Sequence, residues 1–579
     1  MMRIRYVLAI GLLWSSTALA AAADPGASAA LAALTRDYGA HALQRDVYGQ
    51  VSLGQVAGAL PVRDRADLER EVAYADGVRA RLSAVPVAGL TTEERLTAAV
   101  LRWQLDDTAT ALAGDAFVFP GPYGMSELNF VGTALAANPL QTKADEAAYL
   151  ALVGSVGRQL DAMADRLRRQ AAKGIFMPQA QVPRALKALV ALRDQAAAWA
   201  KPARSASPAF AGQAAAETQA VLAALDRVSG VLGPDYLARA PVNAGLAQYP
   251  GGKAYYRQLV KSYTTMETTP EALAAIGREE LTRNSRELAS LADRLGITGG
   301  HAGLKHFVET DPGFFVKTPE ELAARYQHCM DRIAPLLPAW FDPLPNAPYH
   351  TRRLDPALEP GMTYGYYEQP IPDRPEGEYR FNGSNLDKRS QFNACGLIFH
   401  ELMPGHHLQV ASQLENTALP SFRRTLNIGA YAEGWAEYAS NLARDMKAYP
   451  DDRDLLGRLM MNAQIYSRLV VDVGLNYDGW TLAEAAKFLR ENTFISEPEI
   501  ESDLLRYGTD IPGQALSYGA GAVEIAAIRR DAEKQAGKDF DIRRFHREVI
   551  EHGPLPMAVL RAHVLGERAP VIAREVPRR

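Results

Sequence analysis

The sequence predicts a mainly α-helical protein, built as one large multi-helix assembly with a deep cleft and a small β-sheet. Two observations predict the helices: apolar residues recur at helical spacing over most of the chain, and capping residues stand where these periodic runs begin. A third observation predicts the sheet. A stretch rich in proline and tyrosine, between residues 341 and 390, interrupts the helical pattern with short runs typical of strands.

Length and composition are those of an ordinary globular protein. The chain has 579 residues, of which 47% are hydrophobic and 22% are charged, and its formal net charge is −4. Such a chain can bury a sizeable core, and it lacks the basic surface that nucleic-acid binding requires. The two cysteines, Cys329 and Cys395, are too few for a disulfide framework, and the sequence leaves open whether they pair.

Residues 1–20 have the pattern of an export signal. Arg3 and Arg5 precede an apolar run, which ends at the small-residue cleavage site Ala18-Leu19-Ala20. The run is shorter than the roughly 20 residues that a membrane helix needs, and no cysteine follows it to carry a lipid. We therefore expect a periplasmic or secreted protein whose mature chain begins near residue 21. A retained membrane anchor is the alternative.

Residues 21–340 are expected to form an N-terminal helical region. Apolar residues recur at helical spacing in three runs, at residues 150–167, 182–200 and 214–232. Gly174 follows the first run as a stop signal, and capping residues begin two further helices at Thr269-Pro270 and at Thr318-Pro319-Glu320-Glu321. We expect these helices to form the walls of the cleft. Three residues of one loop could line it: Tyr123, Gly124 and Asn129.

Residues 341–579 form the second region, which we expect to pack against the first as one continuous domain. Near its start, residues 364–367 and 378–382 are predicted to be short strands. The unpaired edge of such a strand can bind an extended peptide by β-augmentation. A sheet that merely covers the helices is the alternative.

Reactive side chains concentrate in residues 400–407, which read His-Glu-Leu-Met-Pro-Gly-His-His. In many metallohydrolases, two imidazoles one helical turn apart bind Zn²⁺, and a glutamate between them takes a proton from a metal-activated water. Here the next histidine, His406, comes six positions after His400 instead of about one helical turn. On an ideal helix His406 lies roughly 120° away from His400, and His407 lies about 10 Å further along the axis.

Pro404 and Gly405 offer a way to bring the histidines together. Pro404 has no amide hydrogen to bond the His400 carbonyl and its ring crowds that turn, while Gly405 has unusual backbone freedom. We expect a local bulge that swings His406 back under His400, so that both bind zinc. The alternative is a helix that ends at Pro-Gly, with histidines that cap it or line a core.

A third ligand is expected from the helical stretch 431–438, which contains Glu433 and Glu437. Catalytic zinc usually has three protein ligands and one open position. We choose Glu433 because the adjacent Gly434 permits close approach of the helix to the metal. A solvated helix face with two glutamates is the alternative.

Five motifs stand out in the second region: His400-Glu401 with Pro404-Gly405-His406-His407-Leu408-Gln409, Glu433-Gly434-Trp435-Ala436, Asp472-Val473-Gly474-Leu475, Arg506-Tyr507, and Pro512-Gly513-Gln514-Ala515-Leu516-Ser517-Tyr518. Together they resemble the bacterial domain-of-unknown-function family 885. That family in turn resembles the gluzincin metallopeptidases, which are mostly helical enzymes with two histidines and a glutamate on zinc. One position differs, because the family often has a histidine where this chain has Asn476.

The remaining roles follow from the expected chemistry and from this resemblance. Glu401 is expected to act as the general base. Gluzincins often use a downstream tyrosine to stabilise the charge that develops on the substrate carbonyl, and we expect Tyr518 to do so; a tyrosine simply packed in a helix is the alternative. Substrate binding is expected from Arg506, Tyr507, Gln514 and His407. Arg506 could anchor a substrate carboxylate, while Arg468 and Asp472 are expected to form an ion pair.

We therefore expect an exported zinc-dependent hydrolase that holds one zinc ion and cleaves short peptides or another small amide substrate. A zinc amidase or esterase with a non-peptide substrate is one alternative, and a non-catalytic binding protein that retains the fold is another. We expect no nucleic-acid partner, and no membrane partner after signal removal. The sequence does not determine the oligomeric state, the metal chosen in the cell or the cleavage preference.

Overall fold

The computed structural model describes residues 24–202, 207–356, 359, 364–449 and 451–566. Helices account for most of these residues and one three-stranded sheet accompanies them, so the expectation of a mainly α protein is confirmed. The export signal expected at residues 1–20 lies outside the described residues. Among the helices that are described, none combines the length and the apolar character needed to cross a membrane.

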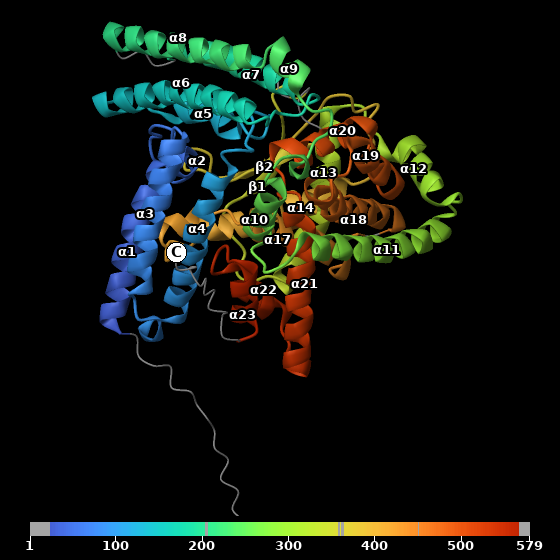
Figure 1. The fold of residues 1–579 in the computed structure, drawn as a ribbon. Coiled ribbons are helices and arrows are strands. Elements are labelled where there is room, and N and C mark those ends of the chain that lie inside the picture. Colours follow the sequence, from blue (N-terminus) through green and yellow to red (C-terminus); the bar gives the residue numbers. More distant parts are fainter. Residues whose placement is uncertain (1–23, 203–206, 357–358, 360–363, 450, 567–579) are drawn as a thin grey trace, which may run out of the picture.

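Among the described residues, thirteen α-helices precede the sheet, and Figure 1 shows how they are arranged. They are α1 (Pro25–Gln44), α2 (Val47–Ser52), α3 (Arg65–Ser83), α4 (Thr92–Gly114), α5 (Ser126–Ala137), α6 (Lys143–Ala172), α7 (Val182–Ala197), α8 (Pro208–Val231), α9 (Pro234–Arg239), α10 (Gly252–Thr264), α11 (Pro270–Leu295), α12 (Gly300–Thr310) and α13 (Pro319–Ile333).

In the described part of the chain, the sheet and ten further α-helices follow. They are β1 (Tyr349–Arg353), β2 (Gly365–Glu368), β3 (Gly377–Phe381), α14 (Ala394–Glu401), α15 (His406–Glu415), α16 (Ser421–Arg424), α17 (Gly429–Asp445), α18 (Asp452–Val473), α19 (Leu482–Asn492), α20 (Glu497–Leu505), α21 (Leu516–Ala536), α22 (Ile542–Ile550) and α23 (Met557–Val564).

The capping residues found in the sequence begin and end helices as expected. The Thr269 side chain accepts a hydrogen bond from a backbone amide in the first turn of α11, and Gly296 ends that helix in the left-handed conformation, at φ 70°. Gly174 follows α6 with φ 75°. Thr481 and Glu484 form a reciprocal capping box at the start of α19.

The small sheet has the strand order β1-β3-β2. β1 pairs with β3 in parallel, and β2 pairs with β3 antiparallel, with Tyr366 opposite Arg380. The two strands expected from the sequence are confirmed as β2 and β3. β1 is not predicted by the sequence, because its run Tyr-His-Thr-Arg-Arg lacks an alternating apolar pattern. β2 is an edge strand that, among the described residues, has a strand partner on one side alone.

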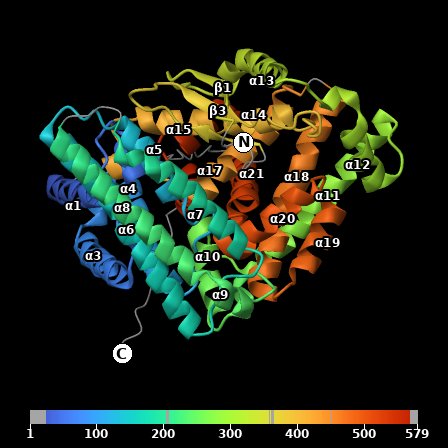
Figure 2. The same ribbon diagram turned by 90° about the horizontal axis from the view of Figure 1, so that it is seen from above.

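Helices from both ends of the chain share hydrophobic cores. One core extends from Leu31 in α1 to Leu560 in α23 and includes Phe399 of α14. A second core joins α6 and α8, which pack side by side along one edge of the molecule (Figures 1 and 2), to Leu516 in α21. Burial of one large apolar side chain contributes roughly 1.5–3 kcal/mol to stability. Neither core stops at residue 340, so the two regions expected from the sequence are packed through common cores.

The two cysteines form a disulfide, a pairing that the sequence alone leaves open. Cys329 and Cys395 are bonded, with their Cα atoms 5.3 Å apart. The bond joins α13 to α14, the helix that ends in His400 and Glu401. The first part of the predicted active region is thereby cross-linked to the helical region before it.

Candidate metal centre

The helix that carries His400 ends directly after Glu401. α15 begins at His406, and the turn between the two helices contains Pro404 in a cis peptide bond to the residue before it. Pro404 has no amide hydrogen with which to continue the helix. Gly405 lies so close to the His400 carbonyl that a Cβ atom there would clash with it. The expected bulge within one helix is therefore wrong, because Pro-Gly ends one helix and a new one follows.

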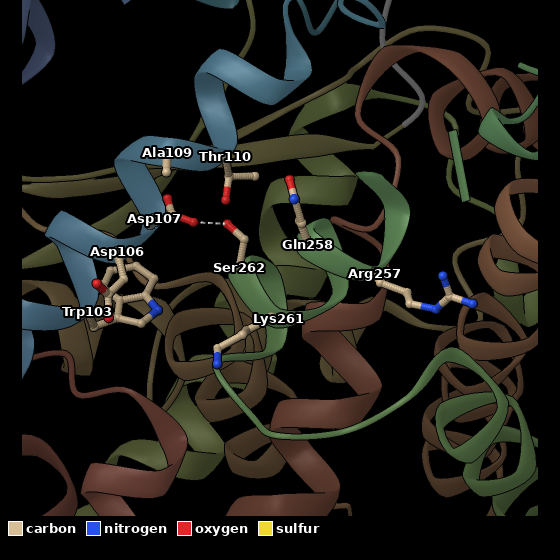
Figure 3. Close-up of a pocket in the computed structure, with 9 residues that line it drawn as sticks. All are labelled: Trp103, Asp106, Asp107, Ala109, Thr110, Arg257, Gln258, Lys261 and Ser262. Carbon is tan, nitrogen blue, oxygen red and sulfur yellow. Dashed lines mark hydrogen bonds between the residues drawn. The ribbon is translucent and has the colours of Figure 1, made fainter. Parts of the chain in front are cut away.

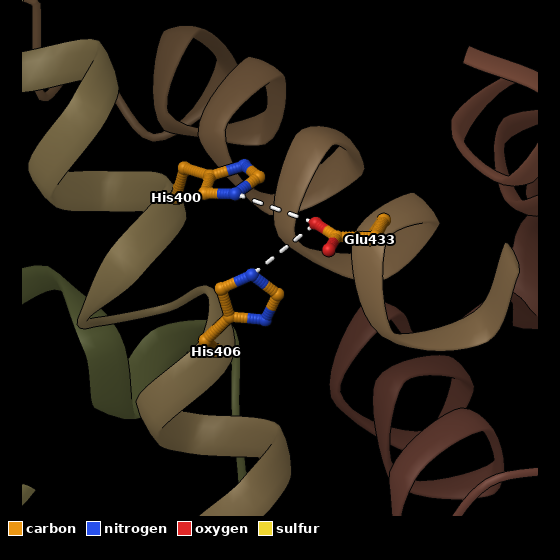
Figure 4. Close-up of side chains that lie close together, drawn as sticks. All are labelled: His400, His406 and Glu433. Atoms are coloured by element: carbon orange, nitrogen blue, oxygen red, sulfur yellow. Dashed lines mark ion pairs between the residues drawn. The ribbon is translucent and has the colours of Figure 1, made fainter. Parts of the chain in front are cut away.

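This helix break brings both histidines to a glutamate of α17 (Figure 4). Nε2 of His400 lies 3.7 Å from Oε2 of Glu433, and Nε2 of His406 lies 3.4 Å from the same oxygen. The three ligand atoms all lie within 4.8 Å of one another. Gly434 has a different role from the one expected, since a Cβ atom there would clash with the backbone of Gly521 in α21. It allows α17 to approach α21 rather than the metal.

The three side chains, which we call the metal centre, fit a divalent metal ion. Oε2 of Glu433 is buried and has no hydrogen-bond donor among the described residues. Leaving a buried polar atom unsatisfied typically costs about 1–3 kcal/mol, and more for a charged group. A cation between the three ligand atoms would satisfy the carboxylate and both imidazoles. Two imidazoles and one carboxylate are also the donors found in catalytic zinc sites that keep an open fourth position.

Glu437 and Arg458 support His400 from behind. Nδ1 of His400 lies 3.0 Å from Oε1 of Glu437, and Oε2 of Glu437 lies 2.6 Å from the Arg458 guanidinium. Burial opposes ionisation of Glu437, but the charges of Arg458 and His400 and their hydrogen bonds to Glu437 together outweigh it and hold the pKa of Glu437 far below its ordinary range. A carboxylate on the far nitrogen fixes the orientation and tautomer of a metal-binding histidine. Arg458 gives no sequence signal, because it reaches the site only through the packing of α18.

The two carboxylates that face the cavity differ in their electrostatic surroundings. Burial raises the pKa of Glu401 above the ordinary value. Burial also opposes ionisation of Glu433, but His406 and His400 together hold its pKa below the ordinary value. The site thus keeps one carboxylate ionised between the imidazoles and places beside it a second that takes up a proton more readily.

The metal centre lies in the wall of a cavity of about 910 Å³, a size typical of small-ligand sites. Glu401, Tyr518 and Arg506 also line this cavity. Tyr123 lines it from the N-terminal region, as expected for its loop, and Tyr366 lines it from β2. Segments that are distant in the sequence therefore enclose one site.

Tyr518 and Arg506 form one side of the cavity next to the metal centre. The Tyr518 ring stacks beside the His400 ring, with centroids 6.3 Å apart, and its hydroxyl accepts a hydrogen bond from Nη2 of Arg506 at 3.3 Å. The Arg506 guanidinium also lies 4.8 Å from the centroid of the Tyr123 ring. Burial raises the pKa of Tyr518, so its phenol stays protonated. Arg506 begins a π-helical turn, a feature frequent at functional sites.

His407, which the sequence suggested as a substrate ligand, does not face the cavity. It is fully buried, with Nε2 2.8 Å from the Ala347 carbonyl and Nδ1 3.0 Å from the Tyr367 hydroxyl. Neighbouring residues on a helix point about 100° apart, so His406 at the metal centre forces His407 away from it. The expected contact of His407 with substrate is therefore wrong.

Two further expected substrate ligands support the cavity from outside. Tyr507 is 1% exposed, and its hydroxyl accepts a hydrogen bond from Nε of Arg468 at 2.9 Å. Oε1 of Gln514 accepts a hydrogen bond from Arg506 at 2.7 Å. Tyr507 is too buried to contact a substrate, so its expected role is wrong, whereas Gln514 is half-buried and its role as a substrate ligand stays a prediction. Gly124 and Asn129, which the sequence suggested could line the cleft with Tyr123, are not among the residues that line this cavity.

Asp472 and Arg468 do not form the expected ion pair. Asp472 accepts a hydrogen bond from the Tyr256 hydroxyl at 2.6 Å, and burial raises its pKa to about 7. Arg468 lies instead over the Tyr518 ring, 4.5 Å from the centroid. Asn476 donates to the Asp472 carbonyl at 2.9 Å. Asp472 thereby links α18 to α10, and Arg468 packs against Tyr518.

A smaller cavity of about 210 Å³ lies between α4 and α10 (Figure 3). Asp107 and Ser262 are hydrogen-bonded there, and Lys261 is paired with Glu267. Within the described part of the chain, no group of metal-binding side chains meets at this cavity. Because its charged groups already have protein partners, we do not assign chemistry to it.

Comparisons with known proteins agree with the fold. The chain matches the family described as "Bacterial protein of unknown function (DUF885)" over residues 48–564. The crystal structure of a "putative lipoprotein" from Colwellia psychrerythraea has a TM-score of 0.78 at 22% identity and covers 93% of this chain and 97% of its own. A "putative lipoprotein of unknown function" from Shewanella oneidensis has a TM-score of 0.69 at 18% identity, and the match covers 93% of this chain and 99% of that protein. No curated protein matches. At these identities the two structures support the fold alone.

Proposed function

Because the chain belongs to this bacterial family of unknown function, its activity must be inferred from its site, and we propose that it is an exported zinc-dependent metallopeptidase that cleaves short peptides. The observation that carries the proposal is the convergence of His400, His406 and Glu433 on one point, beside Glu401, in the wall of the main cavity. The gluzincin-like motifs of the sequence support the same reading.

One zinc ion held by the metal centre would supply the Lewis acidity that activates water and polarises a carbonyl group. The fit rests on the donors themselves, and in particular on the buried Glu433 oxygen that has no hydrogen-bond donor among the described residues. The same donors also accept Mn²⁺, Co²⁺ or Fe²⁺. Metal analysis of the purified protein decides between them.

Glu401 is the proposed general base. It follows His400 directly, lines the cavity and lies beside the metal centre. It would take a proton from the attacking water as the water oxygen bonds to the carbonyl carbon. When the carbon–nitrogen bond breaks, Glu401 would pass a proton to the leaving amine. Hydrolysis is then balanced, because hydroxyl is added to the acyl group and hydrogen to the amine.

Tyr518 is the proposed stabiliser of the negative charge that develops on the carbonyl oxygen. Its ring lies beside His400, it lines the cavity, and its hydroxyl accepts from Arg506 and carries one hydrogen that it can donate. A donor aimed at a developing oxyanion typically lowers the barrier by about 3–4 kcal/mol.

The edge strand β2 favours a peptide substrate. Gly365, Tyr366 and Tyr367 line the same cavity as the metal centre, and the sheet order leaves the outer edge of β2 without a strand partner among the described residues. An extended peptide can bind to such an edge through main-chain hydrogen bonds. A small non-peptide amide or ester would not use these donors and acceptors.

Export is part of the proposal. The pattern in residues 1–20 is that of a signal peptide, and disulfides such as Cys329–Cys395 occur mainly in oxidising compartments. The structural neighbours are described as putative lipoproteins, which is consistent with a cell-envelope location.

The test is metal analysis of the purified protein combined with digestion of a peptide library, with and without a chelator. We expect one zinc ion per chain and cleavage that the chelator abolishes. Glu401→Gln should keep the metal and lower kcat about 10²- to 10⁴-fold. Protein that folds normally but binds no metal would overturn the proposal and favour a binding protein. Metal binding with hydrolysis of amides or esters other than peptides would favour an amidase or esterase.

A further inference from the structure

The geometry points to a substrate class: we infer that the site recognises peptides by their free C-terminal carboxylate, which Arg506 binds, and that cleavage occurs one or two residues before that end. This inference rests on the proposed peptidase function and adds a specificity to it. It makes the protein an exopeptidase that acts from the C-terminus.

Arg506 is a half-buried cation at the cavity, and Asp503 acts on its charge only from beyond ion-pair distance. Its Nη2 donates to Gln514 and to the Tyr518 hydroxyl, while its Nε is buried and has no hydrogen-bond partner among the described residues. It forms no ion pair with any carboxylate in the described part of the chain. Taking an unpaired charge out of water is costly. A guanidinium held in this way is suited to binding a planar carboxylate through two parallel hydrogen bonds.

The acidic residues that line the cavity do not meet this need. They are Asp46, Glu401 and Glu433. Asp46 caps the start of α2 by accepting a hydrogen bond from the Gly49 amide at 2.8 Å, and the other two belong to the metal centre and its base. The anion that complements Arg506 is therefore expected to come from the substrate.

The two ends of a bound peptide can be placed from the rings that flank the metal centre. Tyr518, which contacts Arg506, lies beside His400, whereas Tyr367 of β2 lies beside His406 at a centroid distance of 6.3 Å. β2 and Arg506 thus reach the metal centre past different histidines. The N-terminal part of the substrate would extend along the edge of β2, and the C-terminal part would point to Arg506.

The distance from the metal centre to Arg506 limits the length of the C-terminal part. Arg506 is separated from His400 by one tyrosine side chain, Tyr518. An extended residue spans roughly 3.3–3.6 Å, so one or two residues fill this gap. The expected products are a shortened peptide and a single amino acid or a dipeptide.

The test compares two short peptides that are identical except for a C-terminal carboxylate in one and a carboxamide in the other. With zinc-loaded protein, we expect kcat/KM for the free acid to be roughly 10- to 100-fold higher, the usual worth of a charge-assisted hydrogen-bond pair. Mass spectrometry should place the cut one or two residues from the C-terminus. Equal cleavage of both peptides, or cuts far from that end, would overturn the inference.

Arg506→Gln tests the residue itself. It should lower kcat/KM for the free acid about 10- to 100-fold more than for the amide, while zinc content stays at one ion per chain. Arg424→Gln tests the competing arginine, because Arg424 also lines the cavity and its buried Nε also has no hydrogen-bond partner among the described residues, although its Nη2 donates to the Leu414 carbonyl. If Arg506 binds the carboxylate, this variant should leave the acid-to-amide ratio unchanged. Loss of the preference in the Arg424 variant, or equal losses for both peptides in the Arg506 variant, would contradict the role given to Arg506.

A binding measurement separates this inference from the proposed function. Zinc-loaded Glu401→Gln protein should bind the free-acid peptide more tightly than the amide in calorimetry, even though it turns neither over. If wild-type protein cleaves neither peptide but this preference is present, the hydrolase proposal fails and carboxylate recognition by the cavity stands. If cleavage is chelator-sensitive and the preference is absent, the hydrolase proposal stands and the carboxylate inference fails.

Discussion

The metal centre and a second cluster at the sheet contain the same kinds of side chain, and they differ in what surrounds the carboxylates. The second cluster consists of His350 in β1, Glu376, and Glu378 in β3. In both clusters the ligand atoms lie within 4.8 Å of one another. Residue type and spacing alone therefore do not distinguish them.

Positive charge distinguishes them. Glu378 is fully buried and lies 2.7 Å from Arg352 and 2.6 Å from Arg380, so guanidinium groups already neutralise it. Glu376, in contrast, is 40% exposed. At the metal centre, the cationic or potentially cationic groups within ion-pair distance of the buried oxygen of Glu433 are, among the described residues, the imidazoles of His400 and His406. The proposed metal site therefore rests on a carboxylate whose buried oxygen lies near histidines and forms no ion pair with an arginine among the described residues.

The largest expected effect tests the difference between the two clusters by removing one histidine from each. His400→Ala should abolish stoichiometric metal binding and hydrolysis, because the loss of a ligand exceeds the 10- to 100-fold effect typical of losing a residue that supports one. His350→Ala should leave the metal content at one ion per chain. Elemental analysis after gel filtration measures both. Retained metal in the first variant, or lost metal in the second, would reverse the assignment of the two clusters.

The sequence predicts much of the fold and of the metal centre, but not all of either. Capping residues and apolar periodicity identify the long helices, for example α11 between Thr269 and Gly296, because such signals are local. Pro404 correctly marks an interruption, but the direction of His407 cannot be followed across it, since a helix break resets the angular phase.

Long-range partners are the part that the sequence does not reveal. The pairing of Glu437 with Arg458 depends on how α17 packs on α18, and Tyr123 reaches the cavity from the other end of the chain. The arginines around Glu378 likewise belong to separate strands and a loop. Nothing near these residues in the sequence indicates their partners, so charge balance becomes visible only in the folded structure.

The next effect concerns the support behind His400. Glu437→Gln should weaken metal binding about 10- to 100-fold, because His400 loses the carboxylate on its far nitrogen. It should also lower the free energy of unfolding by about 3–5 kcal/mol, since Arg458 is left buried without a counter-charge. Metal titration and chemical denaturation measure the two losses.

The double variant Glu437→Gln with Arg458→Met separates these two consequences. Removing both charges should restore most of the stability, because no unpaired ion remains, while metal binding stays weak. Recovery of metal affinity together with stability would show that Glu437 acts on the fold rather than on His400.

A smaller effect is expected from the disulfide, which tests whether the site depends on the cross-link beside it. Cys329→Ser with Cys395→Ser opens a loop with a sequence separation of 66 and should lower the free energy of unfolding by about 4 kcal/mol, chiefly through the entropy of the unfolded chain. No ligand changes, so the metal content at 25 °C should remain at one ion per chain. Thermal unfolding and elemental analysis check both, and metal loss in folded protein would assign the disulfide a role in positioning His400.

The smallest effect concerns His546, whose two ring nitrogens, unlike those of the histidines in the metal centre, both have hydrogen-bond partners in the protein. Nδ1 of His546 donates to the Trp340 carbonyl at 2.9 Å and Nε2 accepts from the Tyr438 hydroxyl at 2.9 Å, so both nitrogens are satisfied in the neutral form.

Burial lowers the pKa of His546 from 6.5 to about 3. The unfolded chain therefore binds a proton below pH 6.5 that the folded chain does not bind until about pH 3. Its contribution to stability is complete above pH 6.5 and is lost as the pH falls, by roughly 2 kcal/mol at pH 5. Denaturation curves of the wild type and of His546→Gln between pH 7 and pH 4 measure this term as a difference in slope, and parallel curves would show that His546 is not held neutral.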